Sequence, residues 1–358
     1  MDQSDPLLDP TVIRHAYPGL GTCTYLDTSS CGLMAGSTME AAQEEEKRLV
    51  HEGSSRFLHW MTGGMDAVAR EVAASIGGTA QGTALVPNCS VGMGLLAQLT
   101  RHRAKVLLIG DDYPTLHAPF ALPGSHRVFV RPQADGSIDM EALGTTMERE
   151  RPQMVAIGHV QWLTGYRVDL DAIAGLCRAF GAWSMIDITQ SWCAVPIDAE
   201  RTGIDILCGS GYKWPLAGFG NGFVHLSPVI RAELEERNGV DPIAYLNAGH
   251  RDPVAFTRAK HALERIGRLG TPRIAAYVDA LCTRAVAKCD EAGITVLNGR
   301  SPDQRAGILL LAGDEAKVNS LARQGIRVAL RGAGIRVGIH FYNTAADIER
   351  LVEAWHAD

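Results

Sequence analysis

Lys213 is the residue whose setting first suggests chemistry. It stands between the apolar run DILCGSG and the glycine-rich turn AGFGNG. Lysine is almost never fully buried unless something pairs with it. Asp187 ends another apolar run, and we expect both side chains to face one crevice. Pyridoxal phosphate requires such a pair, because the lysine forms a Schiff base with its aldehyde and the acid keeps its pyridinium nitrogen protonated.

Two other segments could hold the rest of this cofactor. Residues 85–99 begin like a strand, continue through Asn-Cys-Ser and end as an apolar helix. A helix N-terminus offers free N–H groups to a phosphate, and Ser90 could add its hydroxyl, although a plain Ser N-cap is the alternative. Tyr113 follows a predicted strand and could stack on the pyridine ring, or could be an ordinary Tyr-Pro loop residue.

The middle of the chain alternates short apolar runs with helical patterns, which predicts an α/β fold with a mostly parallel, doubly wound sheet. Ligands of such sheets bind beyond the carboxyl ends of the strands. The predicted strands lie within 104–114, 153–162, 182–191, 203–213 and 220–226, and a helix is predicted over 169–181.

The C-terminal part differs in composition. Residues 228–272 are helical and rich in charge, and a long helix, short strands and a final helix follow. Asn343 or Thr344 is the expected N-cap of the final helix, with Asp347 in its first turn. We therefore expect a large domain over 25–254 and a smaller α+β domain over 255–358, which the N-terminal arm 1–24 joins.

Composition excludes several classes of protein. A net charge of -6 without long charge runs argues against a nucleic-acid partner. No run of about 18 apolar residues predicts a membrane span, and the acidic N-terminus does not resemble a signal peptide. The eight cysteines form no CxxC and no zinc spacing, so we expect no metal and predict free thiols in a reducing cytoplasm. No GxGxxG follows the first strand, which disfavours a dinucleotide-binding oxidoreductase.

The whole set of motifs resembles the class V aminotransferase family of fold-type I pyridoxal-phosphate enzymes, which includes cysteine desulfurases, kynureninases, carbon–sulfur lyases and isopenicillin N epimerase-like proteins. The resemblance covers nearly the whole chain, and its segments occur in the family's order. They are YLDTSSCGL (25–33), NCSVGMG (88–94), DITQS (187–191), SGYK (210–213), GTPRI (270–274) and the block from Ile335 to Val352.

The resemblance implies a seven-stranded large-domain sheet, a homodimer with the active site at the subunit interface, and a role for each matched residue. Lys213 would be the Schiff-base lysine, Asp187 the partner of the ring nitrogen, and Arg336 the anchor of the substrate carboxylate through two parallel hydrogen bonds. The other expected cofactor contacts are Gln190 on the ring hydroxyl, Tyr113 on the ring face, Cys89 in the phosphate loop, and Ser90, Ser210, Tyr212 and, across the dimer, Thr271 on the phosphate.

The sequence departs from the family at three points. No cysteine lies between Asn298 and Arg336, where desulfurases carry their mobile catalytic cysteine, so persulfide-forming activity is not expected. Tyr113 stands where the family often has histidine. Trp162 stands where relatives often have Asn near the ring hydroxyl, and Gln161 could substitute in binding substrate. The segment 51–60 could line the entrance or form a solvated helix face.

These residues predict an enzyme that breaks a bond at the α-carbon of an amino acid, with Lys213 as the proton carrier. We favour β-elimination from an S-substituted cysteine, of the carbon–sulfur lyase type. Transamination, epimerisation and decarboxylating deamination begin in the same way and remain alternatives. A paralogue without catalysis is disfavoured, because lysine, acid and arginine are all present.

Overall fold

The computed structural model describes residues 10–133 and 135–357. Its largest sheet has seven strands in the order β2-β8-β7-β6-β5-β3-β4, as expected for the fold. The strands from β7 to β4 are parallel, and β8 runs antiparallel to both of its neighbours. The strands are β2 (Thr83–Val86), β3 (Lys105–Ile109), β4 (His126–Val130), β5 (Met154–Gly158), β6 (Trp183–Asp187), β7 (Ile206–Ser210) and β8 (Gly222–Leu226).

Helices cover both faces of this sheet, and a separate apolar cluster fills the space on each face. The predicted helix over 169–181 is α8: Asp169 caps its N-terminus, and Gly181 ends it in the left-handed conformation that glycine adopts without strain. The helices of this part are α2 (Gly36–Glu52), α3 (Ser54–His59), α4 (Met65–Ser75), α5 (Cys89–Leu99), α6 (Pro114–His117), α7 (Met140–Glu150), α8 (Leu170–Phe180), α9 (Ala199–Thr202), α10 (Pro228–Asn238), α11 (Pro242–Leu246) and α12 (Pro253–Leu269).

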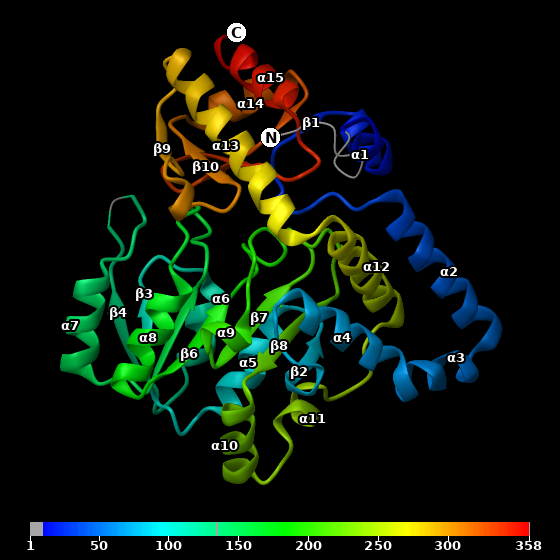
Figure 1. Ribbon diagram of the computed structural model, residues 1–358, viewed down its shortest axis with the longest axis vertical. Coiled ribbons are helices and arrows are strands. Elements are labelled where there is room, and N and C mark those ends of the chain that lie inside the picture. Colours follow the sequence, from blue (N-terminus) through cyan, green and yellow to red (C-terminus); the bar gives the residue numbers. More distant parts are fainter. Residues whose placement is uncertain (1–9, 134, 358) are drawn as a thin grey trace.

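The C-terminal part forms its own layer beside the large sheet (Figure 1). A four-stranded antiparallel sheet, in the order β12-β13-β10-β9, packs with three helices, and a short pair β1-β11 ties in the N-terminal segment. These elements are α1 (Pro10–Ala16), β1 (Thr24–Tyr25), α13 (Thr271–Glu291), β9 (Val296–Asn298), β10 (Ile308–Leu311), α14 (Glu315–Arg323), β11 (Ile326–Arg327), β12 (Ala329–Arg331), β13 (Gly334–Gly338) and α15 (Ala345–His356).

The contacts of α12 bear on where the two domains divide. This helix packs against α2 and α4 of the large part, whereas α13 packs against α15. We therefore propose a division at Gly270 rather than at residue 255. The first nine residues of the proposed N-terminal arm lie outside the described residues.

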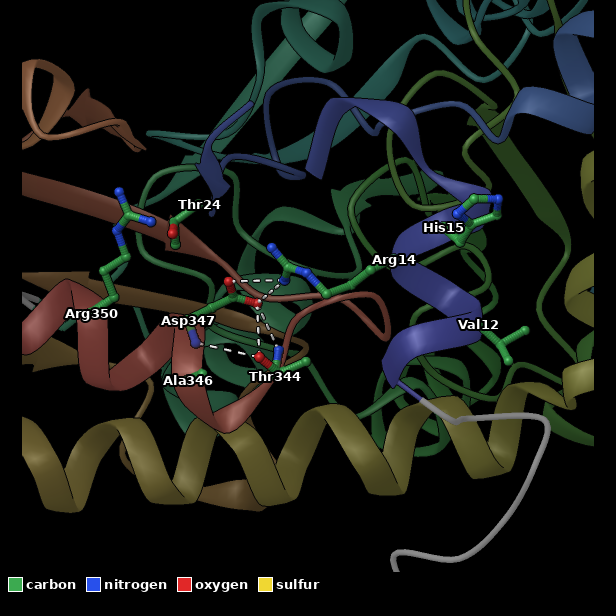
Figure 2. A pocket seen from close by; sticks show the side chains of 8 residues that line it. All are labelled: Val12, Arg14, His15, Thr24, Thr344, Ala346, Asp347 and Arg350. Atoms are coloured by element: carbon green, nitrogen blue, oxygen red, sulfur yellow. Dashed lines mark hydrogen bonds and ion pairs between the residues drawn. The ribbon is translucent and has the colours of Figure 1, made fainter. Parts of the chain in front are cut away.

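The N-terminal helix is fastened to the start of α15 beside a cavity of about 980 Å³ (Figure 2). The Nη1 atom of Arg14 donates to both carboxylate oxygens of Asp347, at 3.1 Å to Oδ1 and 3.0 Å to Oδ2, and forms an ion pair with it. Asp347 also completes a capping box with Thr344, so Thr344 is the N-cap of the final helix. One carboxylate thus holds two chain segments that are far apart in sequence.

Within the part of the chain that the structure describes, no helix is both long enough and apolar enough to cross a membrane.

Candidate active site

A cavity of about 510 Å³ lies beyond the carboxyl ends of the parallel strands. Most of the cofactor-binding residues expected from the sequence line it, although they come from four separate chain segments. Its wall includes Cys89, Ser90, Tyr113, Asp187, Gln190, Ser210, Tyr212 and Lys213. Residues that are 125 positions apart meet here because parallel strands end at one edge of a sheet.

Lys213 is 7% exposed, three residues after the end of β7. Burial, and after it the charge of Arg336, lower the pKa of its ammonium to about 8. Its Nζ lies 5.6 Å from the ring centre of Tyr113 and 5.5 Å from that of Tyr212. A substantial fraction of this amine is therefore neutral near physiological pH, as a nucleophile or base requires.

The backbone around Lys213 is held by a glycine that admits no side chain. The N–H of Gly32 donates to the carbonyl of Tyr212 at 2.9 Å. A Cβ on Gly32 would lie 2.0 Å from the carbonyl oxygen of Lys213. The segment 25–33 therefore contacts the lysine segment directly, and this approach requires glycine at position 32.

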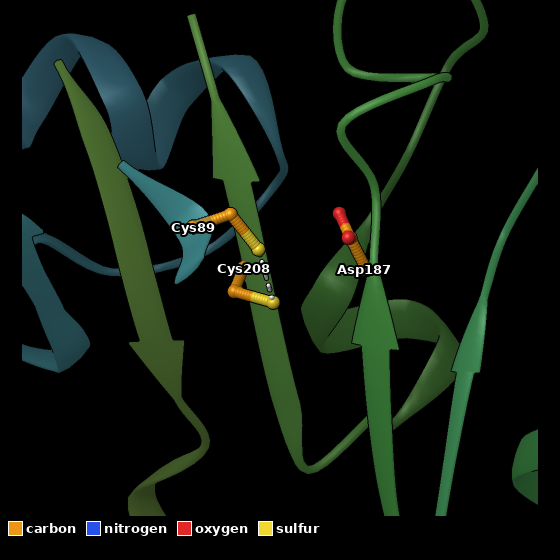
Figure 3. Close-up of side chains that lie close together, drawn as sticks. All are labelled: Cys89, Asp187 and Cys208. Atoms are coloured by element: carbon orange, nitrogen blue, oxygen red, sulfur yellow. Dashed lines mark hydrogen bonds between the residues drawn. The ribbon is translucent and has the colours of Figure 1, made fainter. Parts of the chain in front are cut away.

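Asp187 ends β6 and is 8% exposed. One of its carboxylate oxygens accepts the N–H of Thr189 at 2.8 Å, which leaves the other oxygen for a ligand. Two thiols lie next to it (Figure 3): Cys89 and Cys208, with sulfur atoms 3.3 Å apart. Their hydrogen bond and burial raise the pKa of Cys89, and burial raises that of Cys208, so both thiols are neutral at physiological pH.

The start of α5 forms the end of the cavity that can accept an anion. Asn88, rather than Ser90, is the N-cap, because its side chain accepts the N–H of Val91. The Ser90 hydroxyl is therefore not needed for capping, and it hydrogen-bonds Thr115 Oγ1 at 2.7 Å. The Ser210 hydroxyl accepts the N–H of Cys89 at 2.8 Å and can still donate its own proton.

Tyr113 presents its ring to the cavity from a backbone that Asp112 holds. One oxygen of Asp112 accepts the N–H of Tyr113 at 2.8 Å, and the other accepts that of Gly158 at 2.6 Å. Burial raises the pKa of Asp112 to about 6. Trp162 packs edge-on against Tyr113, with ring centres 5.4 Å apart. These contacts fix the orientation of the tyrosine ring.

Gln190 has one partner on each end of its amide. Its Oε1 accepts the indole N–H of Trp214 at 2.9 Å, and its Nε2 donates to the carbonyl of Ser29 at 3.0 Å. The amide nitrogen has a second hydrogen, which remains available to an oxygen in the cavity. Trp214 is fully buried and so acts in packing and in holding this amide.

Arg336 lies on β13, and its side chain is 2% exposed. Its Nη2 donates to the hydroxyl of Ser30 at 2.7 Å and its Nη1 to the carbonyl of Trp162 at 2.6 Å. Asp27 is 3.9 Å away, and the Arg336 Nε has no hydrogen-bond partner. Burial lowers the pKa of this guanidinium to about 10, so it remains charged at physiological pH. An arginine on a surface salt bridge, the plain alternative, does not describe this environment.

Three residues of the expected site do not line the cavity: Arg336, Gln161 and Thr271. Arg336 lies close enough for its charge to act on Lys213. Gln161 does not line the cavity, because its amide donates to the carbonyl of Asp111 and accepts the N–H groups of Leu163 and Thr164. These hydrogen bonds hold the loop of Gln161 in place, and its expected contact with substrate remains a prediction. Thr271 begins α13 outside the cavity, and its expected role in a neighbouring subunit remains a prediction.

The segment 51–60 forms a small network of its own. Arg56 and the indole of Trp60 both donate to the buried carboxylate of Glu45. His51 and His59 are exposed. A turn of π-helix (Trp60–Gly64) follows, and none of these residues lines the cavity.

Sequence reasoning missed several residues that shape the site. Asp112 lies within the predicted strand region 104–114 without being singled out there, and Ser30 was named only as part of the segment 25–33. Position alone could not reveal that Asp112 would bind two backbone N–H groups or that Ser30 would meet Arg336.

The polar groups that line the cavity fit pyridoxal phosphate. N–H and hydroxyl groups gather at the start of α5, a carboxylate lies at Asp187, and an amine lies at Lys213. These are the partners of a phosphate, a ring nitrogen and an aldehyde, respectively.

Comparisons with known proteins agree with this chemistry. The model of the family "Aminotransferase class-V" matches residues 24–351. An uncharacterized aminotransferase, YcbU, of Bacillus subtilis is 25% identical over 96% of both chains, and isopenicillin N epimerase of Streptomyces clavuligerus is 24% identical over 98% of this chain and 96% of its own.

Solved structures show the same fold. A cysteine desulfurase from Thermococcus onnurineus superposes with a TM-score of 0.86 at 19% identity and 96% coverage of both chains. The cystine C-S lyase C-DES, in complex with cysteine persulfide, gives 0.85 at 17% identity, covering 95% of this chain and 98% of its own. The family match covers most of this chain, which therefore belongs to the class V aminotransferase family of fold-type I enzymes, with pyridoxal phosphate as its cofactor.

Proposed function

We propose that this enzyme holds an α-amino acid by its carboxylate at Arg336 and takes its α-proton with Lys213. The observation that carries the proposal is the position of Lys213, whose buried amine lines the same cavity as Asp187. Burial and then the charge of Arg336 lower the pKa of this amine to about 8. The cofactor supplies an electron sink for the α-carbon. Asp187 would hold the ring nitrogen, Tyr113 the ring face, Gln190 the ring hydroxyl, and Ser90, Ser210 and Tyr212 the phosphate.

For the reaction itself we propose β-elimination from an S-substituted cysteine. Lys213 takes the α-proton, and the Cβ–S bond breaks with its electron pair leaving on sulfur. The thiolate takes up a proton and leaves as a thiol. The remaining unsaturated amino acid takes up water and becomes pyruvate and ammonia. This sequence needs no oxidant and no second amino acid.

The cysteines of the chain favour elimination over persulfide formation. Six of the eight are buried, and only Cys23 and Cys31 are partly exposed. Burial raises the pKa of Cys31, so that its thiol is a poor nucleophile at neutral pH. With no cysteine between Asn298 and Arg336, we infer that the enzyme does not carry sulfur on a thiol of its own.

Transamination is the second candidate, because a relative that matches over 96% of its length carries the name of an aminotransferase. The full-length match to an epimerase keeps epimerisation as a third, and decarboxylating deamination begins in the same way. All of them begin with an amino acid bound at the cofactor, and they differ in which bond of the α-carbon breaks and in what then happens to the electron pair.

The experiment offers the holoenzyme a panel of amino acids and S-substituted cysteines and follows products by mass spectrometry. Pyruvate, ammonia and a thiol, with the cofactor unchanged in mass, are the expected result. A keto acid together with the amine form of the cofactor would show that the reaction is transamination and not elimination. A racemised amino acid or released carbon dioxide would favour the third or fourth reaction.

We also propose that two chains form a homodimer with the site at their interface. Apolar side chains are exposed where α2 and α3 extend away from the sheet (Figure 1). They are Val50, Phe57, Leu58 and Met61, at 77%, 40%, 59% and 50% exposure. An exposed apolar patch is typical of a protein interface. Light scattering after gel filtration should give twice the mass of the chain, and Leu58→Asp should lower it, whereas a monomeric wild-type protein would refute the dimer.

A cytoplasmic location is the remaining proposal. Eight free cysteines and no disulfide occur among the described residues, which suits a reducing compartment. Fractionation of the producing cell would test it.

A further inference from the structure

Two arginines meet at one hydroxyl beside Lys213. Arg336 Nη2 donates to Ser30 Oγ at 2.7 Å, and Arg331 Nη2 lies 3.3 Å from the same oxygen. The function proposed above requires only one guanidinium, because a single α-carboxylate is held by one fork of parallel hydrogen bonds. The second arginine therefore needs a different explanation.

The sheet places both arginines on the same face. Antiparallel pairing sets Ala329 opposite Arg336 and Arg331 opposite Gly334. Residues directly opposite share a face, as do residues two apart along a strand. Arg331 and Arg336 are thus diagonal neighbours across β12 and β13, within reach of one extended ligand.

Among the described residues, no carboxylate forms an ion pair with Arg331, and Asp27 interacts with its charge only at longer range. The only other hydrogen bond of Arg331 runs from Nη1 to the carbonyl of Leu330, and no acid lies within ion-pair distance of it among residues 10–133 and 135–357. Asp27 is the nearest acid to Arg336, at 3.9 Å, and its Oδ1 has no hydrogen-bond partner. Three cationic side chains, counting Lys213, thus face one weakly engaged carboxylate.

The charge of Arg331 also reaches the site. It is one of the charges that lower the pKa of Lys213, after burial and Arg336, and it acts on Arg336 in the same direction. Arg331 is partly exposed, so a ligand can approach its guanidinium, whereas Arg336 is buried behind it.

We propose that Arg331 binds a second anionic group, on the side chain of the substrate. The substrate is then an amino acid with two acidic ends, such as an S-substituted cysteine whose substituent carries a carboxylate. Arg336 holds the α-carboxylate, Arg331 the distal one, and the Ser30 hydroxyl spaces the two guanidiniums. This inference deepens the proposed function and rests on it for the position of the α-carboxylate.

A pair of matched ligands isolates the charge. S-carboxymethyl-L-cysteine and S-carbamoylmethyl-L-cysteine have nearly the same shape and differ by one negative charge. We expect kcat/KM for thiol release to be about 10- to 100-fold higher for the carboxymethyl compound, a range discounted for the partial exposure of Arg331. Arg331→Gln should reduce the ratio to near one, and Arg331→Lys should restore part of it. Arg327→Gln, on an exposed residue of β11, is the matched control.

A binding measurement separates this inference from the reaction type. Desamino analogues of the two ligands cannot react with the cofactor, so calorimetry on the holoenzyme gives their dissociation constants directly. We expect the dicarboxylate to bind about tenfold or more tightly than its carbamoyl analogue in the wild type and equally in Arg331→Gln. Unchanged melting temperatures would show that the variants are folded.

Each outcome has a defined meaning. If no cysteine derivative releases a thiol but the dicarboxylate still binds preferentially, elimination is wrong and the anionic subsite stands. If the wild type releases thiols from both compounds equally, or the preference persists in Arg331→Gln, the subsite is refuted. Failure of the dicarboxylate to bind at all would also refute it.

Discussion

Arg305 and Arg336 are equally buried, with 2% of each side chain exposed, yet their surroundings differ. Arg305 donates through all three of its guanidinium nitrogens, to α13 and to one backbone segment after β9. Its Nε and Nη2 reach Asp279, and its Nη1 reaches the carbonyls of Gly299 and Arg300. Arg336 leaves its Nε without a partner and its nearest carboxylate at 3.9 Å.

The difference distinguishes an arginine that stabilises the fold from one whose remaining hydrogen-bonding capacity is available to a ligand. Burying a charge is costly unless it is paired and hydrogen-bonded. At Arg305 the protein itself supplies the partners. At Arg336 the protein supplies only some of the hydrogen-bond partners and no close carboxylate. Because its charge is not fully paired, this guanidinium can bind the carboxylate of a ligand. Substitution of Arg305 should therefore lower stability and spare activity, whereas substitution of Arg336 should do the reverse.

The largest effect on stability is expected from Arg305→Ala. It leaves Asp279 and several carbonyls without their donor, and the free energy of unfolding should fall by about 3 kcal/mol. Urea denaturation of the cofactor-loaded protein measures this. Activity per folded molecule should be nearly unchanged. A stable but inactive variant would contradict a purely structural role.

The converse substitution, Arg336→Gln, should spare the fold and damage activity. We expect kcat/KM to fall by about 100-fold or more, because the substrate carboxylate loses a charged, bidentate partner. Most of the loss should appear in KM. The urea midpoint should change little. If activity survives, Arg336 does not bind the substrate carboxylate.

The same variant should act on Lys213, whose pKa burial and then Arg336 lower from 10.5 to about 8. Between these two values the unfolded chain holds more protons on this residue than the folded protein does. The stability of the cofactor-free protein should therefore gain a contribution from this group as pH rises through this window.

Removing the Arg336 charge should raise the pKa of Lys213 and shrink that gain. Denaturation of both cofactor-free proteins at several pH values from about 7.5 to 10 gives the difference, and Arg327→Gln is the control for a lost charge elsewhere. Identical pH profiles for wild type and Arg336→Gln would show that the two cations do not interact.

The smallest effect on stability is expected at the ion pair between the partly exposed Arg14 and the buried Asp347 (Figure 2). Arg14→Ala should lower the free energy of unfolding by about 1 kcal/mol, since Arg14 is 35% exposed and screened by solvent. Asp347→Asn should cost somewhat more, because it also weakens the capping box of α15. Melting temperatures of the two variants, compared with that of the double variant, would show whether the pair is coupled.

Much of the fold could be predicted because its signals are local. The apolar runs that end at Asp187 and Ser210 are buried strands, and Asp169 and Gly181 bound a helix as their residue types predict. The sequence predicted Asn343 or Thr344 as the N-cap of the final helix, and in the structure the N-cap is Thr344. The domain division was less predictable, because α12 has an amphipathic pattern that does not say which part of the protein it covers.

The site divides in the same way. Lys213, Asp187 and the start of α5 could be proposed because strand ends and helix starts are readable in sequence and because the motifs resemble a family. Gln161 was expected to bind substrate, but its amide hydrogen-bonds backbone groups of its own loop and the carbonyl of Asp111. A sequence shows which polar side chains are present, but not which groups they hydrogen-bond in the folded protein.

The sequence by itself determined the order of the elements, the lysine and acid at strand ends, and the family, since each depends on residue types at short spacing. Only the tertiary structure decided which groups are left without partners. Ser30, Arg331 and Arg336 lie up to 306 residues apart, and their meeting depends on how a loop and two strands pack. Hydrogen-bond satisfaction and desolvation are properties of that packing, and they distinguish Arg336 from Arg305.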